Sequence, residues 1–550
     1  MENNKQSKLK NFIVQGGILA LAGVLVRILG LAKRIPLPYI IGDIGNSYYS
    51  VAYEIYNIVF VISAYGIPLS VSKLVSSKVG KGEYRNADKI FKCALGISSI
   101  TGILTSSLVF IFADKLSRLL NEPMSFLALR ALAPLLFIVC IMGVFRGYFQ
   151  GLGSNIPTAI SQLVEQVFLI IVGLTGAYIL TGYGEKVGLL LHNENYKYAY
   201  GACGATMGCT IGALCGLIFL IMLYKANYKY IKKRIYRDPT HKIDSTFDVI
   251  RNFIFTVIPV ILSNFINYVS NILDMYIHNL FMEKKGIDST LKSTNWGIYS
   301  GKYLVIINIP IAISAAMGVS TVPAIAGLLK KKEYKEIRVK INKVIKITML
   351  IAIPCAVGIF ALAPQIMWFL FSTTNETAYN LLRIGAPGVV LFSLMTLTTG
   401  ILQGLDHLRK PIAHGVISLA LHVTILISLL NFTDLNIYAV ALSNNFFSLF
   451  MCIMNIYSIR KVIHQKFEIR KTFVMPFVSS VIMGALVYVL GLLLSKIGYS
   501  RILILLIILL GAFVYLAIML LTRTITKDEL DSIPGGDKFY RLFKKLRLCS

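Results

Sequence analysis

The chain has 550 residues, of which 56% are hydrophobic and only 15% are charged. Too few polar side chains remain to cover a soluble globule of this size, so lipid is the expected solvent. The formal net charge of +29 does not indicate a nucleic-acid partner, because the basic residues stand beside apolar segments, where anionic lipid headgroups would meet them. We therefore expect an all-α polytopic membrane protein that interacts with membrane lipids.

Apolar runs of about 20 residues, the length that crosses the hydrocarbon core of a bilayer, recur along the chain and predict about fourteen transmembrane helices. Residues 1–10 are polar and basic, and no small-residue cleavage pattern follows the first run. That run is therefore expected to be retained rather than removed as a signal peptide. The expected spans are 11–32, 47–71, 90–112, 126–149, 156–180, 201–224, 252–275, 296–323, 344–371, 379–402, 411–430, 437–458, 473–494 and 501–522.

Basic residues gather in alternate connections between these spans. Clear cases are the segments 229–234 and 330–332 and the tail at 544–547. Cytoplasmic connections keep Lys and Arg during insertion, whereas translocated connections are depleted of them. The pattern therefore predicts an even number of helices with both termini in the cytoplasm.

A weak internal repeat with an offset of about 253 residues relates the first six spans to the next six. The matching pairs are 129–134 with 382–387, 147–152 with 400–405, and, at an offset of about 250, 81–84 with 331–334. Halves with an even number of helices run the same way, so an axis along the membrane normal should relate two lobes that enclose the substrate path. The predicted parts are an N-terminal six-helix lobe (1–225), a cytoplasmic basic linker (226–250), a C-terminal six-helix lobe (251–460), and a final helix pair with a basic tail (461–550).

Basic residues inside the spans carry most of the functional information, because such residues are costly in lipid and usually face a cavity or a partner. Arg27 lies in the first span, Lys33 and Arg34 follow at its outer end, and Lys302 lies about two turns into the eighth span. Arg27 and Lys302 reach a similar depth and could share one cavity. Positive charge in a cleft between the lobes predicts an anionic substrate, and a phosphate or diphosphate matches Arg and Lys best.

A second interpretation applies to the basic residues nearest the outer ends of spans. Arg130 and Arg383 occupy equivalent places in spans 4 and 10, and they and Arg34 could instead extend to the outer headgroups. Arg146, near the cytoplasmic end of span 4, is interpreted as an interfacial anchor.

Acidic residues inside the spans are fewer. Glu54 lies in span 2, Glu165 near the middle of span 5, and Asp274 at the end of span 7. Glu54 is assigned to the headgroup site because its depth is close to that of the cations. Glu165 and Asp274 are candidates for pairing with the cations or for coupling to an ion.

Three tyrosines follow helical spacing along span 2. Tyr49, Tyr53 and Tyr56 form an aromatic stripe beside Glu54, which could stack on sugar rings. Packing within the protein and an interfacial aromatic belt are the alternatives.

Motifs for energy-consuming or catalytic chemistry are absent from the sequence. There is no G-x-x-x-x-G-K-[ST] loop for ATP, no His-Glu-x-x-His or clustered Cys/His motif for a metal, and no Asp-rich loop for magnesium. The cysteines show no C-x-x-C pair, which favours packing over metal binding or disulfides. We therefore predict a transporter without catalytic residues, metal or cofactor, driven by the membrane potential or an ion gradient.

Several motifs resemble one known family. They are RILG at 27–30, RIPL at 34–37, YEIY at 53–56, GIPLSVSKLV at 66–75 and YSGKY at 299–303. The chain resembles the MurJ, YtgP and SpoVB group of the multidrug/oligosaccharidyl-lipid/polysaccharide (MOP) exporter superfamily, in its Gram-positive YtgP-like branch. The likeness covers both halves of the chain, and a fourteen-helix fold agrees with it.

The resemblance implies that the chain flips lipid II, the undecaprenyl-diphosphate-linked peptidoglycan precursor, to the outer leaflet by alternating access. It also implies that Arg27, Lys33 and Lys302 hold the diphosphate and that a groove beside helices 13 and 14 takes the lipid tail. A basic residue in helix 2 of the Gram-negative members has no counterpart here, where Phe60 and Val61 stand.

Other substrates and roles stay open at this stage. The nearest alternative is export of another lipid-linked oligosaccharide, such as a teichoic, capsular or spore cortex precursor. A cation-coupled drug exporter would suit twelve helices and an acidic or aromatic cavity, and a scaffold for cell-wall synthesis proteins is a role of a different class. In each case the expected location is the cell membrane of a bacterium.

Overall fold

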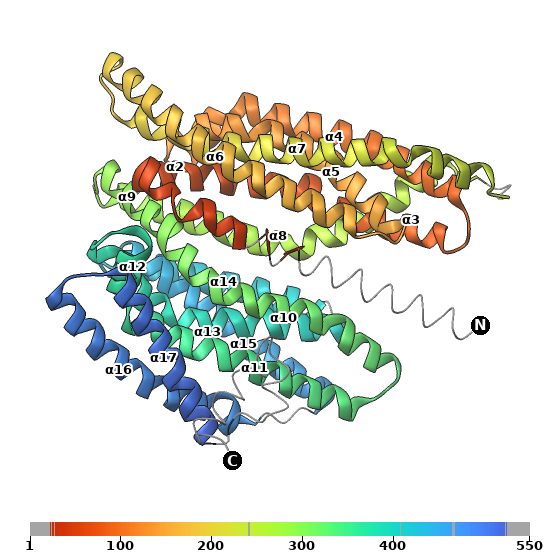
Figure 1. Cartoon of the computed structure of the whole chain (residues 1–550). Coiled ribbons are helices and arrows are strands. Elements are labelled where there is room, and N and C mark those ends of the chain that lie inside the picture. Colours follow the sequence, from red (N-terminus) through yellow and green to blue (C-terminus); the bar gives the residue numbers. More distant parts are fainter. Residues whose placement is uncertain are drawn as a thin grey trace. The chain divides into compact units, whose positions relative to one another are not determined.

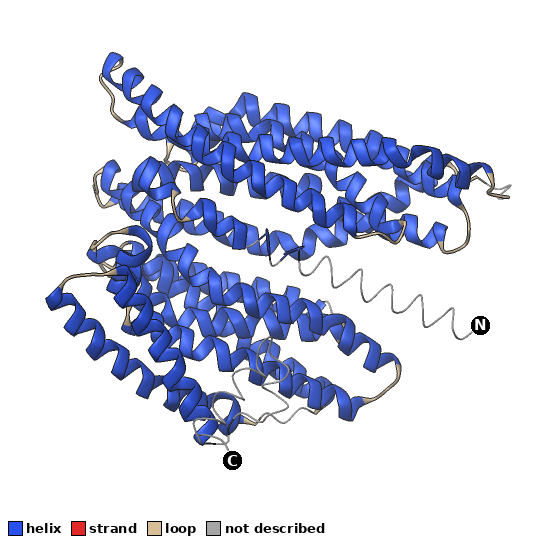
Figure 2. Ribbon diagram, viewed as in Figure 1, coloured by secondary structure: helices blue, strands red, loops and turns tan. Residues whose placement is uncertain are grey.

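This computed structural model describes residues 22–23, 25–26, 28–239, 243–407, 409–464, 468–522 and 524. Within these residues the chain forms helices joined by loops, with no strand (Figure 2). The prediction of an all-α membrane protein is confirmed: twelve helices of the described part are long and apolar enough to cross a membrane. Of the two other predicted spans, 11–32 lies mostly outside the described residues. Span 252–275 falls in a helix several of whose side chains are also outside them.

The contacts divide the chain into two units, residues 1–301 and 302–550, and each is described here by itself. The first contains helical residues 28–34 and then α2 (Leu37–Phe60), η1 (Val61–Tyr65), α3 (Ile67–Val79), α4 (Tyr84–Leu119), η2 (Pro123–Ser125), α5 (Phe126–Gly151), α6 (Ile156–Leu190), α7 (Asn195–Tyr236), α8 (Thr246–Lys284) and α9 (Ser289–Ile298). The π-helical segment η3 (Tyr299–Tyr303) crosses the division.

The second unit contains α10 (Leu304–Lys330), α11 (Tyr334–Ala361), α12 (Ala363–Phe371), α13 (Glu376–Gly404), α14 (Arg409–Phe432), α15 (Ile437–Ile463), η4 (Arg470–Val474), α16 (Met475–Ile497) and α17 (Arg501–Leu521). The repeat had instead predicted a boundary within 226–250. Because α8 and α9 pack against α2, and α8 also packs against α3 and α4, both helices group with the first unit.

Glycines allow α6 and α7 to pack along their lengths in the first unit (Figure 1). A Cβ added at Gly204 would overlap the backbone of Gly176, and one at Gly208 would overlap the backbone of Gly173. Small residues at such spacing let two helix backbones approach closely, which is how helices associate within lipid. The glycine stripe therefore fixes the spacing of this helix pair.

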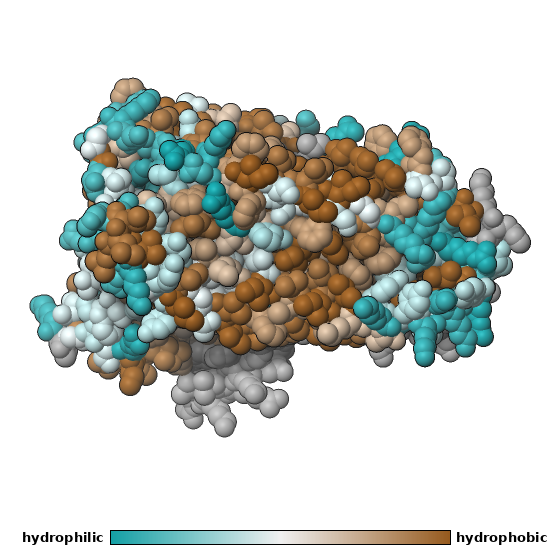
Figure 3. All heavy atoms as spheres, turned by 90° about the horizontal axis from the view of Figure 1, so that it is seen from above, coloured by the Kyte–Doolittle hydropathy of each residue, from teal (hydrophilic) through white to brown (hydrophobic). Residues whose placement is uncertain are grey.

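The outer surface of the first unit suits a lipid environment. Helix α4 exposes a series of large apolar side chains, namely Ile100, Ile103, Leu104, Leu108 and Ile111. Figure 3 shows hydrophobic residues gathered in the middle of the face in view and hydrophilic residues at its two ends. This distribution is expected where a hydrocarbon layer lies between two polar boundaries.

The turns of the two units support the internal repeat geometrically. Before α4, Gly82 has φ 83° and Glu83 has φ −81° and ψ 68°; before α11, Lys332 has φ 61° and Glu333 has φ −83° and ψ 62°. The same backbone hydrogen bonds close both turns, including Glu83 N to Lys78 O and Glu333 N to Leu328 O. A matched pair of turns, one with glycine and one with lysine in the left-handed region, indicates related halves rather than chance recurrence of apolar residues.

The C-terminal helices α16 and α17 pack on each other and on α11. Their shared core includes Met483, Val487 and Met519, and the Tyr515 hydroxyl donates to the Leu350 carbonyl at 3.0 Å. This packing places α16 beside α11, where it forms one wall of the groove described below.

Candidate functional site

Lys33 is buried among three helices of the first unit. Only 3% of the residue is exposed, and its Nζ donates to the Ala205 carbonyl at 3.0 Å and lies 3.5 Å from Cys209 Sγ, both on α7. The ammonium also lies 3.3 Å from the Tyr49 hydroxyl and 4.8 Å from the centre of that ring. The Lys33 side chain passes over Gly173 of α6, where a Cβ would stand 3.2 Å from its Cε.

The charge of Lys33 has no acidic partner within the described part of the chain, where its polar contacts are the carbonyl, hydroxyl and thiol just named. A buried cation held by dipoles and an aromatic ring alone is costly in lipid. Such a group is a candidate for binding an anion, because a phosphate would supply the negative charge that the described residues around Lys33 do not provide.

The predicted tyrosine stripe is a continuous row of rings. Tyr49 and Tyr53 stack with centroids 5.8 Å apart and planes 12° apart, and Tyr53 to Tyr56 follows at 5.6 Å. The row continues through Phe60 and Tyr65 to Tyr268 of α8, with separations up to 6.5 Å. The three predicted residues therefore contact one another, and stacking on a sugar stays a prediction.

Glu54 faces α8. Its carboxyl group interacts with the side chains of Asn57 and Asn271 and lies within electrostatic range of Asp274 and Arg34. The Oε2 atom is buried without a hydrogen-bond partner. Asp274 itself is 2% exposed, so α2 and α8 place two carboxyl groups within electrostatic range of each other inside the first unit.

Arg146 and Glu165 form an ion pair between α5 and α6, with Arg146 Nη2 2.8 Å from Glu165 Oε2. Arg146 Nε also donates to the Ser161 hydroxyl at 3.0 Å. Both charged side chains are mostly buried, at 14% and 21% exposure. The interpretation of Arg146 as an interfacial anchor is therefore replaced by pairing inside the unit.

The other predicted basic residues lie in different surroundings, and one of them is outside the described residues. Arg27 lies outside the described residues, so its shared cavity with Lys302 stays a prediction. Lys302 is 7% exposed and lies in the π-helical segment η3. Arg34 is exposed. Arg130 lies over the rings of Phe110 and Phe126 at 5.8 and 5.2 Å.

The second unit contains a large apolar groove between α11, α13 and α16, with a volume of about 1170 Å³. Among the described residues that line it, Arg383 is the charged one. Its guanidinium lies 5.5 Å from the ring of Tyr379. The apolar lining includes Val357 and Phe360 from α11, Val390 from α13, and Phe477, Val481 and Ala485 from α16.

A polar cluster joins the turn between α4 and α5 to α8 and α9. Glu122 is 3% exposed, accepts from Ser293 Oγ at 2.7 Å and lies 4.0 Å from Lys292 Nζ. Lys292 donates to the Asn121 carbonyl at 2.6 Å, and Asn279 of α8 donates to the Leu120 carbonyl at 2.8 Å. These contacts fasten the turn to the two helices.

Burial raises the pKa of Glu122 from 4.5 to about 7, although Lys292 and the Ser293 hydrogen bond oppose the shift. The folded protein therefore holds this proton more tightly than the unfolded chain does, and the resulting stability is present below pH 4.5 and lost as the pH rises through about 7. We expect Glu122→Gln to reduce the fall in melting temperature between pH 5 and pH 8. Glu185→Gln, which removes an exposed carboxylate, should leave that fall unchanged; equal slopes for wild type and Glu122→Gln would contradict the prediction.

Residues 13–329, more than half of the chain, match the family model described as polysaccharide biosynthesis protein. The chain belongs to this polysaccharide biosynthesis protein family. Residues 303–428 also match the MatE family model. Stage V sporulation protein B of Bacillus subtilis (strain 168) is 23% identical over 531 residues, which cover 96% of this chain and 98% of that protein. Lipid II flippase MurJ of the same organism is 26% identical over 432 residues, covering 75% of this chain and 76% of that protein.

Solved structures show the same fold. Lipid II flippase MurJ in an inward closed conformation matches with a TM-score of 0.65 at 16% identity, covering 91% of this chain and 97% of that chain. An inward-facing multidrug resistance MATE transporter of the MOP superfamily matches with a TM-score of 0.64 at 15% identity, covering 81% and 98%. The resemblance to the MurJ and SpoVB group is confirmed, and this member of the polysaccharide biosynthesis family is a multi-pass membrane protein.

Membership in this family does not predict the π-helical segments η1, η3 and η4 found among the described residues. One of them contains Lys302, and another contains Tyr65 of the aromatic row. Segments of this kind occur often at functional positions of helices. Pro68 and Pro476, each in the second position of the helix that follows a π-helical segment, are sequence signals for such an irregularity at η1 and η4, because proline cannot donate to the preceding turn.

Proposed function

We propose that the chain moves a lipid-linked anionic oligosaccharide across the membrane by alternating access, and that lipid II is the first cargo to test. The observation that carries the proposal is the groove of the second unit, which combines a large apolar lining with one charged side chain, Arg383, among the described residues. An isoprenoid chain with a diphosphate headgroup is complementary to such a groove, because its tail is long and apolar and its headgroup is negatively charged.

The size of the groove supports a lipid rather than a compact solute. Its volume of about 1170 Å³ lies above the range of roughly 300–1,000 Å³ that is usual for small-molecule pockets. Arg383 offers the forked geometry that binds phosphate oxygens in pairs. The buried charge of Lys33 in the first unit supports the same sign of cargo.

Two curated relatives suggest the cellular setting. MurJ is named as a lipid II flippase, whereas the match to stage V sporulation protein B extends over nearly the whole of both chains. A cargo delivered during sporulation is therefore the second candidate. The two candidates are distinguished by complementation. The chain is expressed in a strain depleted of its lipid II flippase and in a strain lacking the sporulation protein, and the defect that it corrects identifies the cargo.

A substituted groove makes that test specific. Ala485→Trp places an indole among the residues that line the groove, whereas Leu486→Trp adds the same side chain to a neighbouring exposed position of α16 outside the lining. We expect the first variant to lose complementation, because the indole would fill the space that the lipid tail occupies. The second variant should retain complementation. Equal growth of both variants at equal membrane levels would refute the groove as the lipid path.

The proposed driving force is the membrane potential or an ion gradient, as the lack of a nucleotide-binding motif suggested. Glu54 and Asp274 are the carboxyl groups best placed to respond to a cation or proton, because they lie within electrostatic range of each other on α2 and α8. Glu165 is less suitable, since its carboxylate is already paired with Arg146.

A further inference from the structure

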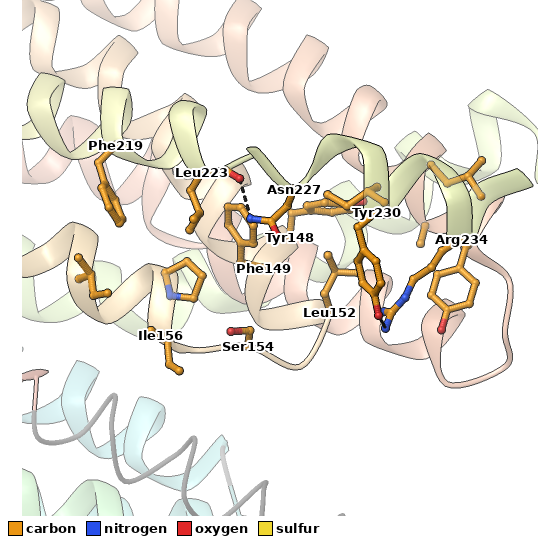
Figure 4. A pocket seen from close by; sticks show the side chains of 16 residues that line it. Tyr148, Phe149, Leu152, Ser154, Ile156, Phe219, Leu223, Asn227, Tyr230 and Arg234 are labelled. Carbon is orange, nitrogen blue, oxygen red and sulfur yellow. Dashed lines mark hydrogen bonds between the residues drawn. The ribbon is translucent and has the colours of Figure 1, made fainter. Parts of the chain in front are cut away.

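A second pocket lies in the first unit, apart from Lys33 and from the apolar groove. It has a volume of about 380 Å³ and is bounded by the start of α4, the end of α5, the start of α6 and the C-terminal part of α7 (Figure 4). This volume falls within the range of about 300–1,000 Å³ of ordinary ligand sites. None of its lining residues takes part in the candidate transport site described above.

The two ends of this pocket differ in chemistry. At one end lie Ile156, Ile160, Phe219 and Leu223, and the first two of these are 41% and 40% exposed. This end is therefore apolar and open to the surrounding lipid. At the other end, Figure 4 shows Asn227, Tyr230 and Arg234 following one another along α7.

Arg234 is held by aromatic rings rather than by a carboxylate. Its Nη2 donates to the Tyr230 hydroxyl at 2.6 Å, and its Cζ lies 4.5 Å from the Tyr230 ring and 5.6 Å from the Tyr84 ring. Within the described part of the chain Arg234 has no acidic partner. Its remaining donors can therefore bind an anion without breaking an ion pair.

Acidic groups at this end of the unit have partners of their own. Asp238, which follows the basic part of α7, is buried and accepts from the Arg85 backbone N–H at 2.7 Å. Glu83 and Asp244 both contact Lys78, at 2.8 and 2.6 Å. Asp88 pairs with Lys92 at 2.7 Å. The charge near the pocket is therefore positive, and residues 225–237 of α7 and its end contain Lys225, Lys229, Lys232, Lys233, Arg234 and Arg237 with no Asp or Glu.

We propose that this pocket binds an anionic phospholipid, with one acyl chain along Ile160, Phe219 and Leu223 and the phosphate on Arg234. Clusters of Lys and Arg beside a transmembrane helix attract anionic lipid headgroups. Here the cluster stands at the polar end of a cavity whose other end accepts a hydrocarbon chain. Such a lipid would fasten the ends of α4, α6 and α7 to the leaflet on the basic side of the protein.

Binding of phosphatidylglycerol and phosphatidylcholine to the purified full-length protein, followed by native mass spectrometry, tests this site. We expect Arg234→Gln to weaken phosphatidylglycerol binding about fivefold, the effect of one basic residue at such a surface. Lys233→Gln is the matched control, because Lys233 carries the same charge on the preceding residue of α7 but is exposed and outside the pocket. It should change binding less than twofold.

Substitutions at the apolar end test the acyl chain separately. Leu223→Trp and Ile160→Trp should each weaken phosphatidylglycerol binding with Arg234 intact, and glycerol phosphate without acyl chains should not compete. Equal losses in Arg234→Gln and Lys233→Gln would show diffuse attraction and overturn the site. Unchanged binding in both tryptophan variants, in proteins that keep the wild-type melting temperature, would also overturn it, as would competition by glycerol phosphate.

Discussion

Replacing Lys33 with methionine should reduce transport at least about tenfold and leave the protein folded. A charge-assisted contact to phosphate contributes about 1.5–3 kcal/mol, which corresponds to a factor of ten or more. Methionine is also unbranched, so its side chain can lie over Gly173 as the lysine side chain does. Because the ammonium is buried without an acidic partner in the described part of the chain, its removal should leave the melting temperature unchanged or raise it.

The rate at which labelled lipid appears in the outer leaflet of proteoliposomes, measured together with the melting temperature, checks this prediction. Tyr49→Phe is the matched control, because it removes a hydroxyl that contacts Lys33 and keeps both the ring and the charge. If Lys33 only fastens helices, Lys33→Met should lower the melting temperature and transport together. Transport at the wild-type rate in Lys33→Met would show that Lys33 does not belong to the anion site.

Replacing Gly208 with leucine should destabilise the protein by about 3 kcal/mol, the upper end of the usual cost of overpacking, because the added side chain meets rigid backbone. A side chain at Gly208 meets the backbone of Gly173 on α6. Any separation of α6 from α7 would also displace Gly173 from beneath Lys33. We therefore expect loss of folded protein in membranes and, in whatever survives, loss of transport.

Gly182→Leu is the control for this prediction, because a Cβ there has no atom within 4 Å and Gly182 lies on the same helix α6. Leucine has the higher helix propensity, so this variant should be neutral or slightly more stable. Thermal unfolding in detergent compares the two variants directly. Equal melting temperatures would show that the helices are not in the close contact described here.

The helical class and most spans could be predicted from the sequence, because twenty consecutive apolar residues can satisfy their backbone groups in lipid only as a helix. The repeat was also detectable, since segments such as 81–84 and 331–334 match in sequence, and the structure has the same left-handed turn at Gly82 and Lys332. The sequence could not show where α8 and α9 pack. That grouping depends on side-chain contacts with α2, which hydropathy does not encode.

The candidate site was less predictable than the fold. Depth in the membrane identified Arg27, Lys302 and Glu54 as unusual, and family resemblance added Lys33, but a linear sequence does not show which helix faces which. It therefore missed the pairing of Arg146 with Glu165 across α5 and α6. The groove was expected only through family resemblance, because its walls come from three separate segments of α11, α13 and α16 and no single one of them is distinctive.

The central claim, transport of a lipid-linked anionic oligosaccharide, is tested most directly with the purified wild-type protein in liposomes. Fluorescent lipid II placed in the inner leaflet should become accessible to an external quencher faster than in protein-free liposomes, and unlabelled undecaprenyl diphosphate should compete. A lipid-linked neutral sugar without phosphate should not move. Movement of lipid II at the protein-free rate, together with no binding of any undecaprenyl diphosphate, would contradict the account.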